Sequence, residues 1–320
     1  MEKLKYIVFL FVLVSCKSAN KSSVGNLDSL AGKGLNYEYI QNKIKESKSK
    51  PDQQGCDFKN IRKQISSYKD LGIVSIPIAE NIIKRCISSL DESNKDSVYI
   101  LFVNLFYNSA NPFTESLETK YSGVLKKIEK DINDSETKDF KKCLDVCGLT
   151  LLMSEGTYYV DVKYDYFYNL FKGKVSPALD VFLKIRSKEM KQGYSEDAGL
   201  LISFEELYDR VTTWEDFNIK YPDFFLNGES ESYYISYLST FLTGMDNSRT
   251  FDLDNEKLLP ELKKLYEKII ERKDARKSSK IISDYYDLLK NNDFKQPDNL
   301  SKFLKDNGLF SMLGVQPETR

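Results

Sequence analysis

The chain has 320 residues, which allows one large domain or two smaller ones, and 41% of them are hydrophobic, enough for a substantial core. Its 47 Lys and Arg residues nearly balance 48 Asp and Glu residues, so the net charge of −1 does not indicate a nucleic-acid-binding protein. The chain contains no histidine. This absence excludes Ser-His-Asp and Cys-His catalysis, imidazole metal sites and histidine-based pH switches.

The N-terminus has the pattern of a secretory signal. Lys3 and Lys5 make a short basic start, and an apolar stretch follows over residues 6–14. As a helix this stretch would span about 13 Å, less than half of a hydrocarbon core of about 30 Å. We therefore expect an export signal here and no membrane-spanning anchor.

The signal ends in Leu13-Val14-Ser15-Cys16. This sequence resembles the lipobox of bacterial lipoproteins, in which a cysteine follows an apolar residue and two small ones directly after the apolar stretch. The resemblance covers residues 1–16 and implies cleavage before Cys16 and its acylation, with palmitate among the expected chains; about two or three chains anchor a protein stably. By the same resemblance, Lys17 after the cysteine favours the outer over the inner membrane. The alternative is an ordinary signal peptide followed by a cysteine by chance.

The domain organisation follows from composition. Residues 1–15 are the expected signal peptide, and residues 16–55 are the lipidated cysteine and a flexible tether, since they are rich in Ser, Lys, Asn and Gly. Residues 56–320 form the expected helical body, with a sub-boundary near residue 195.

The cysteine count suits an exported protein. Four cysteines remain once Cys16 carries lipid, an even number that allows disulfides in an oxidising compartment. Cys56 and Cys86 lie near the open end of a helical hairpin expected over residues 57–70 and 77–90, so a disulfide between them is one expectation. The alternative is that all four thiols are free and buried, as is common for cysteine.

Cys143 and Cys147 are four residues apart on an expected helix, where their side chains share a face but point poorly toward each other. A metal site at this pair would need further ligands. We expect no metal and no cofactor.

The apolar spacing of the body is helical. The segment Val98–Tyr107 is apolar all round except at Asn104, which predicts a buried central helix. A second segment shows the periodicity most clearly, at Leu258, Leu262, Leu265, Tyr266, Ile269 and Ile270.

Helix-start signals recur along the body. Asn111-Pro112 and Ser176-Pro177 place a cap before a proline, and Ser203 with Glu206 forms a capping box. Alternating β-rich segments are not evident, so the sequence predicts an all-α fold of antiparallel helix hairpins in an α-solenoid-like or bundled array. The segment from Tyr266 to Leu289 weakly resembles a tetratricopeptide-type helix pair, which implies the shape class alone.

The candidate ligand-binding residues gather between positions 155 and 168. On a helix, Tyr158, Asp161, Asp165 and Tyr168 would share one face, with Glu155 just before them. Such a face could bind a basic peptide, or stack a sugar ring against aromatic rings while carboxylates hold its hydroxyls. The alternative is core packing with the tyrosine hydroxyls reaching solvent.

Two functions remain open. The first is a non-enzymatic lipoprotein of the cell envelope that binds another envelope protein, as an assembly scaffold or as an immunity protein. The alternative is a solute-capture lipoprotein that binds a glycan or peptide through the tyrosine-rich segment. We expect no catalytic residues, and we expect the partners to be the membrane, through the lipid on Cys16, and another envelope protein, but no nucleic acid.

Overall fold

The structure is a computed structural model that describes residues 35–49 and 55–311. The expected signal peptide, Cys16 and much of the expected tether lie outside these residues. Packing divides the chain into two compact units between Lys188 and Glu189, a division that falls within helix α8.

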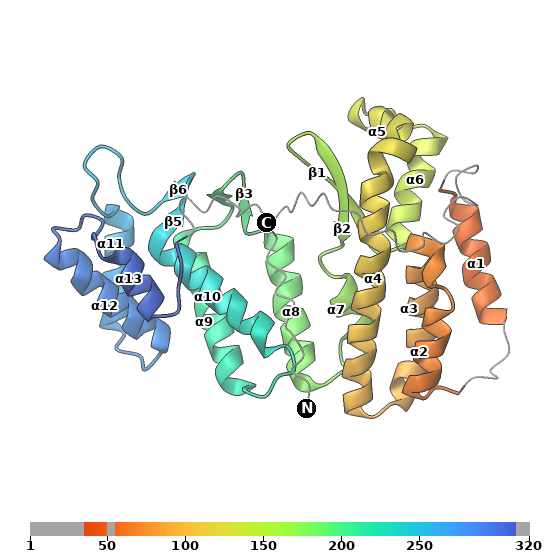
Figure 1. The fold of residues 1–320 in the computed structure, drawn as a ribbon, viewed down its shortest axis with the longest axis horizontal. Coiled ribbons are helices and arrows are strands. Elements are labelled where there is room, and N and C mark those ends of the chain that lie inside the picture. Colours follow the sequence, from red (N-terminus) through yellow and green to blue (C-terminus); the bar gives the residue numbers. More distant parts are fainter. Residues whose placement is uncertain (1–34, 50–54, 312–320) are drawn as a thin grey trace. The chain divides into compact units, whose positions relative to one another are not determined.

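The N-terminal unit consists of helices and one β-hairpin (Figure 1). Its elements are α1 (Tyr37–Ser49), α2 (Phe58–Ser66), the 3-10 segment η2 (Lys69–Val74), α3 (Ser75–Cys86), the 3-10 segment η3 (Ile87–Ser89), α4 (Glu92–Lys120), α5 (Ser122–Glu129), α6 (Ser135–Val146), β1 (Leu149–Ser154), β2 (Thr157–Val162), α7 (Tyr166–Phe171) and α8 (Pro177–Gln192).

The C-terminal unit contains helices and two very short hairpins. Its elements are β3 (Ser195–Glu196), β4 (Gly199–Leu200), α9 (Phe204–Lys220), α10 (Asn227–Thr243), β5 (Gly244–Met245), β6 (Ser248–Arg249), α11 (Pro260–Glu271), α12 (Lys277–Asn291) and α13 (Leu300–Asp306). The fold is thus all-α, because in the described residues the strands pair only as isolated antiparallel hairpins.

Helix α4 is the centre of the N-terminal unit. It contacts α2, α3, η2 and β2, and it contains the segment predicted as a buried central helix. Phe102 and Phe106 of this helix are fully buried, and their rings contact Phe167 at centroid distances of 6.1 and 5.2 Å. A helix that is apolar on all of its faces is expected where other elements pack against it on several sides.

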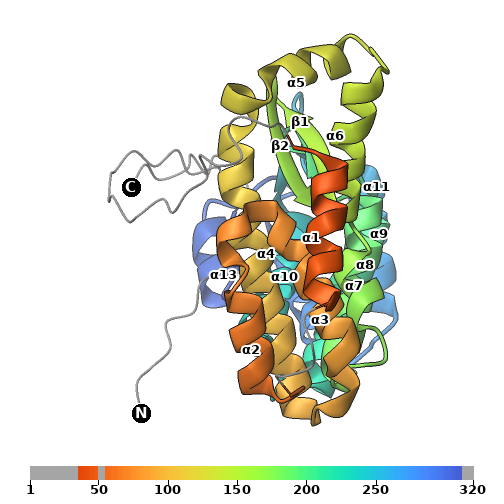
Figure 2. The same cartoon turned by 90° about the vertical axis from the view of Figure 1, so that its right-hand side faces the viewer.

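The expected flexible tether over residues 16–55 is wrong for its described C-terminal part. Residues 37–49 form helix α1, which packs against α3 and α6 (Figure 2). Ile40 is fully buried, and the Tyr37 backbone N–H donates to Asp139 Oδ2 at 3.1 Å. Few apolar residues are needed here, because two well-placed isoleucines, Ile40 and Ile44, suffice to bury one face of a short helix.

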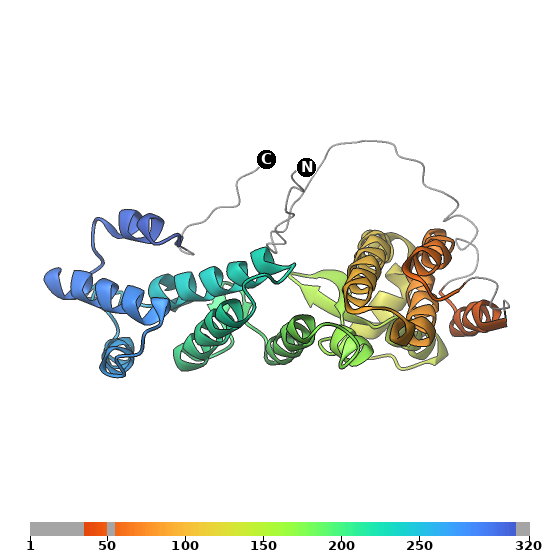
Figure 3. The ribbon, with the colours of Figure 1, turned by 90° about the horizontal axis from the view of Figure 1, so that it is seen from below.

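Successive helices of the C-terminal unit pack in pairs. α9 packs against α10, and α11 packs against α12; Figure 3 shows these helices in teal and blue. The fully buried side chains of Trp214, Phe241, Tyr266 and Tyr285 contribute to the core. This pairing agrees with the predicted antiparallel helix hairpins.

Two of the helix-start predictions are confirmed and one is wrong. Pro177 is the first residue of α8, and Ser203 with Glu206 forms the capping box of α9. Pro112 instead lies inside the 29-residue helix α4. The helix continues through it because Ala110 and Phe113 on either side are buried, so tertiary packing outweighs the lost backbone hydrogen bond.

Candidate functional site

The predicted binding face does not form. Residues 157–162 are strand β2, so Tyr158 and Asp161, at an odd spacing, point to opposite faces of the hairpin. Asp165 and Tyr168 lie beyond the strand, before and within α7, and Glu155 is exposed in the turn. The helix-based grouping is therefore wrong, because side chains that share a face at a period of 3.6 residues separate at a period of two.

Three of these residues make local contacts instead. Asp161 accepts a hydrogen bond from the Val162 backbone N–H at 2.6 Å, and burial raises the pKa of its carboxyl group. Asp165 Oδ2 accepts from the Asn169 amide at 2.7 Å. The Tyr168 ring lies 5.9 Å from the Lys172 ammonium group.

The β1–β2 hairpin closes through a two-residue turn at Glu155-Gly156. Both residues have positive φ, 49° and 80°, as in type I′ turns, which match the twist of a hairpin. A signal for this turn is present in the sequence, because a glycine follows an acidic residue between a strand of leucines and one with alternating valines. This signal contradicts the helical interpretation of residues 155–168.

A common junction occurs in both units, in which a helix ends at a glycine, a β-hairpin follows, and a further helix begins. The glycines are Gly148, Gly193 and Gly244, with φ of 69°, 80° and 73°. A Cβ atom would lie 2.5 Å from the Tyr166 ring at the first, 2.9 Å from Leu201 at the second and 2.5 Å from the Ser248 carbonyl oxygen at the third. Each glycine therefore supplies both a left-handed turn and a close approach.

The two hairpins of the C-terminal unit cover each other. The Asn247 backbone N–H in the β5–β6 turn donates to the Ala198 carbonyl oxygen at 3.0 Å, and the Leu200 backbone N–H of β4 donates to Ser248 Oγ at 2.8 Å. The Asn247 side-chain amide also donates to the Asp197 carbonyl oxygen, at 2.5 Å. The backbone N–H groups of Leu200 and Asn247 are thus satisfied within the unit.

The two outer edges of the β1–β2 hairpin differ in the hydrogen-bond partners of their backbone groups. Its two-residue loop makes Ser154 and Thr157 a hydrogen-bonded pair, so by alternation the backbone groups of residues 151 and 153 on β1, and of 158 and 160 on β2, point outward. On the β2 edge, the Val160 N–H donates to Thr114 Oγ1 of α4 at 3.1 Å. For the β1 edge, no hydrogen-bond partner of Leu151 or Met153 occurs beyond the hairpin in the part of the chain that the structure describes.

Two apolar side chains of β1 near the end of this hairpin are exposed. Met153 is 60% exposed and Leu152 is 37% exposed. The register sets Leu152 opposite Tyr159 on one face and Met153 opposite Tyr158 on the other. β1 carries no charged residue along Leu149–Ser154, whereas natural edge strands usually carry a charge or a proline that blocks pairing.

A buried polar cluster lies in the C-terminal unit. Glu189 is 5% exposed, and its two carboxylate oxygens accept hydrogen bonds from Trp214 Nε1 at 2.8 Å and the Tyr237 hydroxyl at 3.0 Å. Arg210, also buried, donates to Gln192 Oε1 at 2.9 Å and lies over the Tyr237 ring. Since these partners are all internal, the cluster joins α8, α9 and α10 rather than facing a ligand.

A partly buried contact connects distant parts of the N-terminal unit. The Tyr166 hydroxyl donates to Glu80 Oε2 at 2.6 Å, and burial raises the pKa of this tyrosine. The free thiols of Cys143 and Cys147 are also buried, and burial raises the pKa of Cys143 to about 12. Such thiols are poor nucleophiles.

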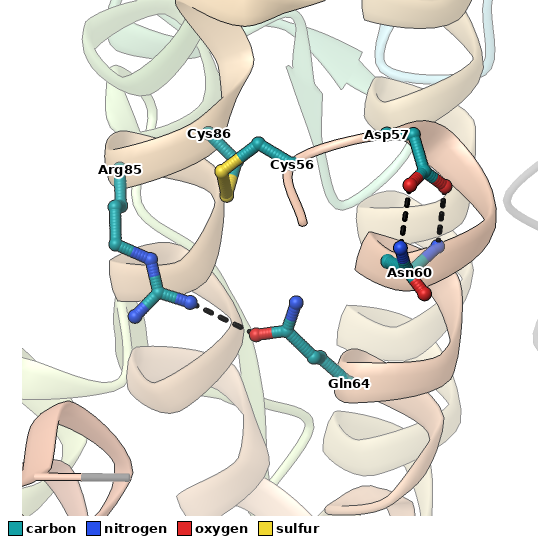
Figure 4. Close-up of a disulfide and its surroundings, with 6 residues drawn as sticks. All are labelled: Cys56, Asp57, Asn60, Gln64, Arg85 and Cys86. Carbon is teal, nitrogen blue, oxygen red and sulfur yellow. Dashed lines mark hydrogen bonds between the residues drawn. A yellow bond between two sulfur atoms is a disulfide. The ribbon is translucent and has the colours of Figure 1, made fainter. Parts of the chain in front are cut away.

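A disulfide joins Cys56, just before α2, to Cys86 at the end of α3 (Figure 4). The pairing is one of the two alternatives left open by the sequence, and its S–S distance is 2.04 Å. Nearby, Arg85 donates to Gln64 Oε1 at 2.9 Å, a further link between the same two helices. The disulfide closes the open end of the α2–α3 hairpin, and the hydrogen bond connects the end of α3 to the last turn of α2.

A shallow hollow between α1 and α3 carries three cationic side chains. It is lined by Ser47, Lys48, Asn81, Ile82, Lys84 and Arg85. Lys84 forms an ion pair with Glu80, and Arg85 is bonded to Gln64. These partners compete with an anion, so the hollow is not a built anion site.

The described residues contain no group of three or more Cys, Asp or Glu side chains placed to hold a metal ion. Among the helices that the structure describes, none is long and apolar enough to cross a bilayer. Comparisons of the chain with protein-family models, curated proteins and solved structures found no match. The candidate site therefore rests on the chain's own geometry, and it is the exposed end of the β1–β2 hairpin.

Proposed function

We propose that this chain is a lipid-anchored helical protein of the cell envelope that binds another envelope protein, as an assembly scaffold or as an immunity protein. The anchor would be the acylated Cys16, in the outer rather than the inner membrane. The disulfide between Cys56 and Cys86 supports an oxidising compartment, where such bonds persist.

The observation that carries the binding role is the exposed pair Leu152 and Met153 at the end of the hairpin. Exposed aliphatic side chains on adjacent positions cost solvation free energy in a monomer, and a protein partner that covers them recovers it. Tyr159 lies opposite Leu152 on one face of the hairpin, and Tyr158 lies opposite Met153 on the other. Each face therefore pairs an aliphatic side chain with a tyrosine, a residue enriched in protein interfaces.

The solute-capture alternative has lost its structural basis. It depended on Tyr158, Asp161, Asp165 and Tyr168 sharing one helical face, and two of these residues lie on a strand. We propose no catalytic activity.

The test uses the full chain, expressed with a C-terminal tag in the cells it comes from and purified in detergent from the envelope fraction. We expect one protein to be retained in a stoichiometric amount. We also expect Cys16→Ser to lose the acyl chains in a mass spectrum and to leave the membrane fraction. If no envelope protein is retained by the anchored wild type, the binding role is wrong.

The matched pair of variants is Met153→Lys and Ile219→Lys. Both place a charge at a strongly exposed apolar side chain, since Ile219 of α9 is 69% exposed. We expect Met153→Lys to lose the partner and Ile219→Lys to keep it, because burying a lysine charge in an interface is unfavourable.

A further inference from the structure

We propose that the outer edge of β1 is a strand-addition site, at which an extended and uncharged segment of the partner pairs with Leu151 and Met153. This inference rests on the proposed function and goes beyond it, because it names the backbone geometry of recognition. The hydrogen-bond pattern of the hairpin determines which backbone groups of β1 point outward. The Lys163 backbone N–H donates to the Gly148 carbonyl oxygen at 3.0 Å, which places residues 148 and 163 in a hydrogen-bonded pair. Hydrogen-bonded and non-hydrogen-bonded pairs alternate along the two strands. Counting from this pair or from the turn gives the same result, namely that the backbone groups of Leu151 and Met153 point away from β2.

The two edges of the hairpin differ in their hydrogen bonds. On the β2 edge, the Val160 N–H is bonded to Thr114 of α4 and the Val162 N–H to the neighbouring Asp161 side chain, while the outward Tyr158 N–H has no partner among the described residues. At the β1 edge the described residues supply no such partner for Leu151 or Met153. Open backbone donors and acceptors in an extended row are satisfied best by another extended segment.

The two short hairpins of the C-terminal unit contact each other through a backbone hydrogen bond. In the C-terminal unit, β5–β6 meets β3–β4 by donating the Asn247 backbone N–H to the Ala198 carbonyl oxygen. Those strands have two residues each, whereas β1 has six. The longest strand pair therefore has an outer edge, at β1, where the Leu151 and Met153 backbone groups have no partner in the described part of the chain.

The chemistry of the occupant follows from the side chains beside the edge. Leu152 and Met153 present aliphatic groups on opposite faces of the hairpin, and no charge lies along β1. A partner strand would therefore place apolar or β-branched side chains next to both faces, and a charged residue at those positions would be desolvated without a partner.

The first test uses a defined probe, the peptide acetyl-Lys-Val-Thr-Val-Thr-Val-Lys-amide, with the full chain in detergent. Hydrogen exchange is followed at individual amides. We expect the peptide to slow exchange of the Leu151 and Met153 amides by about tenfold or more, while the Leu152 amide, already bonded within the hairpin, changes little. The same peptide with all of its valines and threonines N-methylated, so that neither edge can donate, should have no effect. Equal protection by both peptides, or no protection at either amide, would overturn the proposal.

The second test compares Met153→Pro with Met153→Ala. Both remove the exposed side chain, but only the proline removes the outward N–H, a substitution that edge strands tolerate. We expect binding of the peptide, and of the envelope partner, to be at least about tenfold weaker for Met153→Pro than for Met153→Ala, since one lost hydrogen bond to a docked strand is worth about this factor. Thermal unfolding of both variants verifies that each is folded.

The outcomes separate the two proposals. If the envelope partner binds Met153→Pro and Met153→Ala equally, strand addition is wrong while the binding role stands. If the wild type retains no envelope protein, the binding role is wrong, and the peptide experiment alone decides the edge.

Discussion

The indole N–H of Trp214 donates to Glu189 Oε1 at 2.8 Å inside the C-terminal unit. Trp214 is the single tryptophan of the chain and is fully buried, so its fluorescence reports on the surroundings of this contact. The second oxygen of Glu189 accepts from the Tyr237 hydroxyl. One carboxylate therefore joins α8 to both α9 and α10.

Glu189→Gln is expected to destabilise the protein by about 1–3 kcal/mol, because an amide offers one acceptor oxygen to two donors and leaves one of them unsatisfied. Denaturant unfolding followed by Trp214 fluorescence measures the change, and the native emission should also shift. Glu231→Gln, at an exposed position beyond the first turn of α10, is the control and should change stability by less than about 0.5 kcal/mol. An equal effect of the two variants would contradict the role of Glu189.

Two buried tyrosines form a matched pair with opposite expectations. The Tyr266 hydroxyl donates to the Phe241 carbonyl oxygen at 3.0 Å, whereas the Tyr285 hydroxyl is buried with no hydrogen-bond partner in the described residues. We expect Tyr266→Phe to lose about 1 kcal/mol and Tyr285→Phe to be neutral or to gain up to about 1 kcal/mol. The free energy of unfolding of each variant decides this, and a loss in Tyr285→Phe as large as in Tyr266→Phe would contradict it.

Alanine substitutions at three glycines distinguish the stability cost of backbone strain from the cost of steric overlap. Gly148→Ala combines positive φ with a Cβ 2.5 Å from the Tyr166 ring, so we expect a loss of about 2–5 kcal/mol. Gly173→Ala has positive φ and open space, and should lose about 1–2 kcal/mol. Gly123→Ala, on α5 with open space and no positive φ, should gain up to about 1 kcal/mol. Thermal unfolding should rank the variants in this order, and any other order would mean that the turn relaxes.

Removal of the disulfide is expected to destabilise the N-terminal unit. The bond closes a loop with a sequence separation of 30 residues, for which chain entropy predicts a loss of about 3–4 kcal/mol. Cys56→Ser/Cys86→Ser should therefore unfold at a lower temperature than the wild type. A reducing agent should lower the wild type to the level of the double variant and leave that variant unchanged; a shift in both would point to another effect of the reductant.

The pH dependence of stability should contain two contributions of opposite sign. Asp134 accepts from Lys127 Nζ and caps α6, and these bonds lower its pKa to about 2. Its stabilisation is present above the pKa of the unfolded chain and is lost as the pH falls toward 2. Burial raises the pKa of Asp161 in the folded state, so the contribution of this group falls as the pH rises from its unfolded pKa to its raised folded pKa.

Asp134→Asn should therefore be less stable than the wild type at pH 7, and Asp161→Asn should be more stable there. Chemical denaturation between pH 2 and pH 7 measures both variants against the wild type. If Asp161→Asn follows the wild-type pH profile unchanged, the shift assigned to Asp161 is wrong.

The helical array can be predicted from sequence because its signals are local. Apolar spacing at Leu262, Leu265, Tyr266 and Ile269 places these side chains on one face of α11, where all four are buried. The capping box at Ser203 also acts within a single turn. Helix α1 escapes prediction because Ile40 and Ile44 are too few to stand out, and the elements that cover them, α3 and α6, lie far along the chain.

The candidate site shows where sequence reasoning fails. Aromatic and acidic residues near Tyr158 fit a helical wheel, although the Glu155-Gly156 turn makes the segment a hairpin. Even if residues 157–162 are correctly predicted as a strand, the sequence does not show which edge of the hairpin is bonded. That depends on the hydrogen bond from the Val160 N–H to Thr114 Oγ1, and the two residues are 46 positions apart in the chain.

By itself, the sequence determined the absence of histidine chemistry and the helical character of the body, since each depends on residue type or on neighbours within a few turns. The export signal and the acylation of Cys16 stay predictions of the same local kind. Tertiary structure alone decided that Glu189 meets Trp214 and Tyr237, and that Cys56 bonds to Cys86 rather than remaining free. It also decided that the β2 edge is bonded to α4 while the β1 edge is open in the described residues. These outcomes depend on distances between residues far apart in the chain, and such distances are set by how whole helices pack rather than by any local pattern.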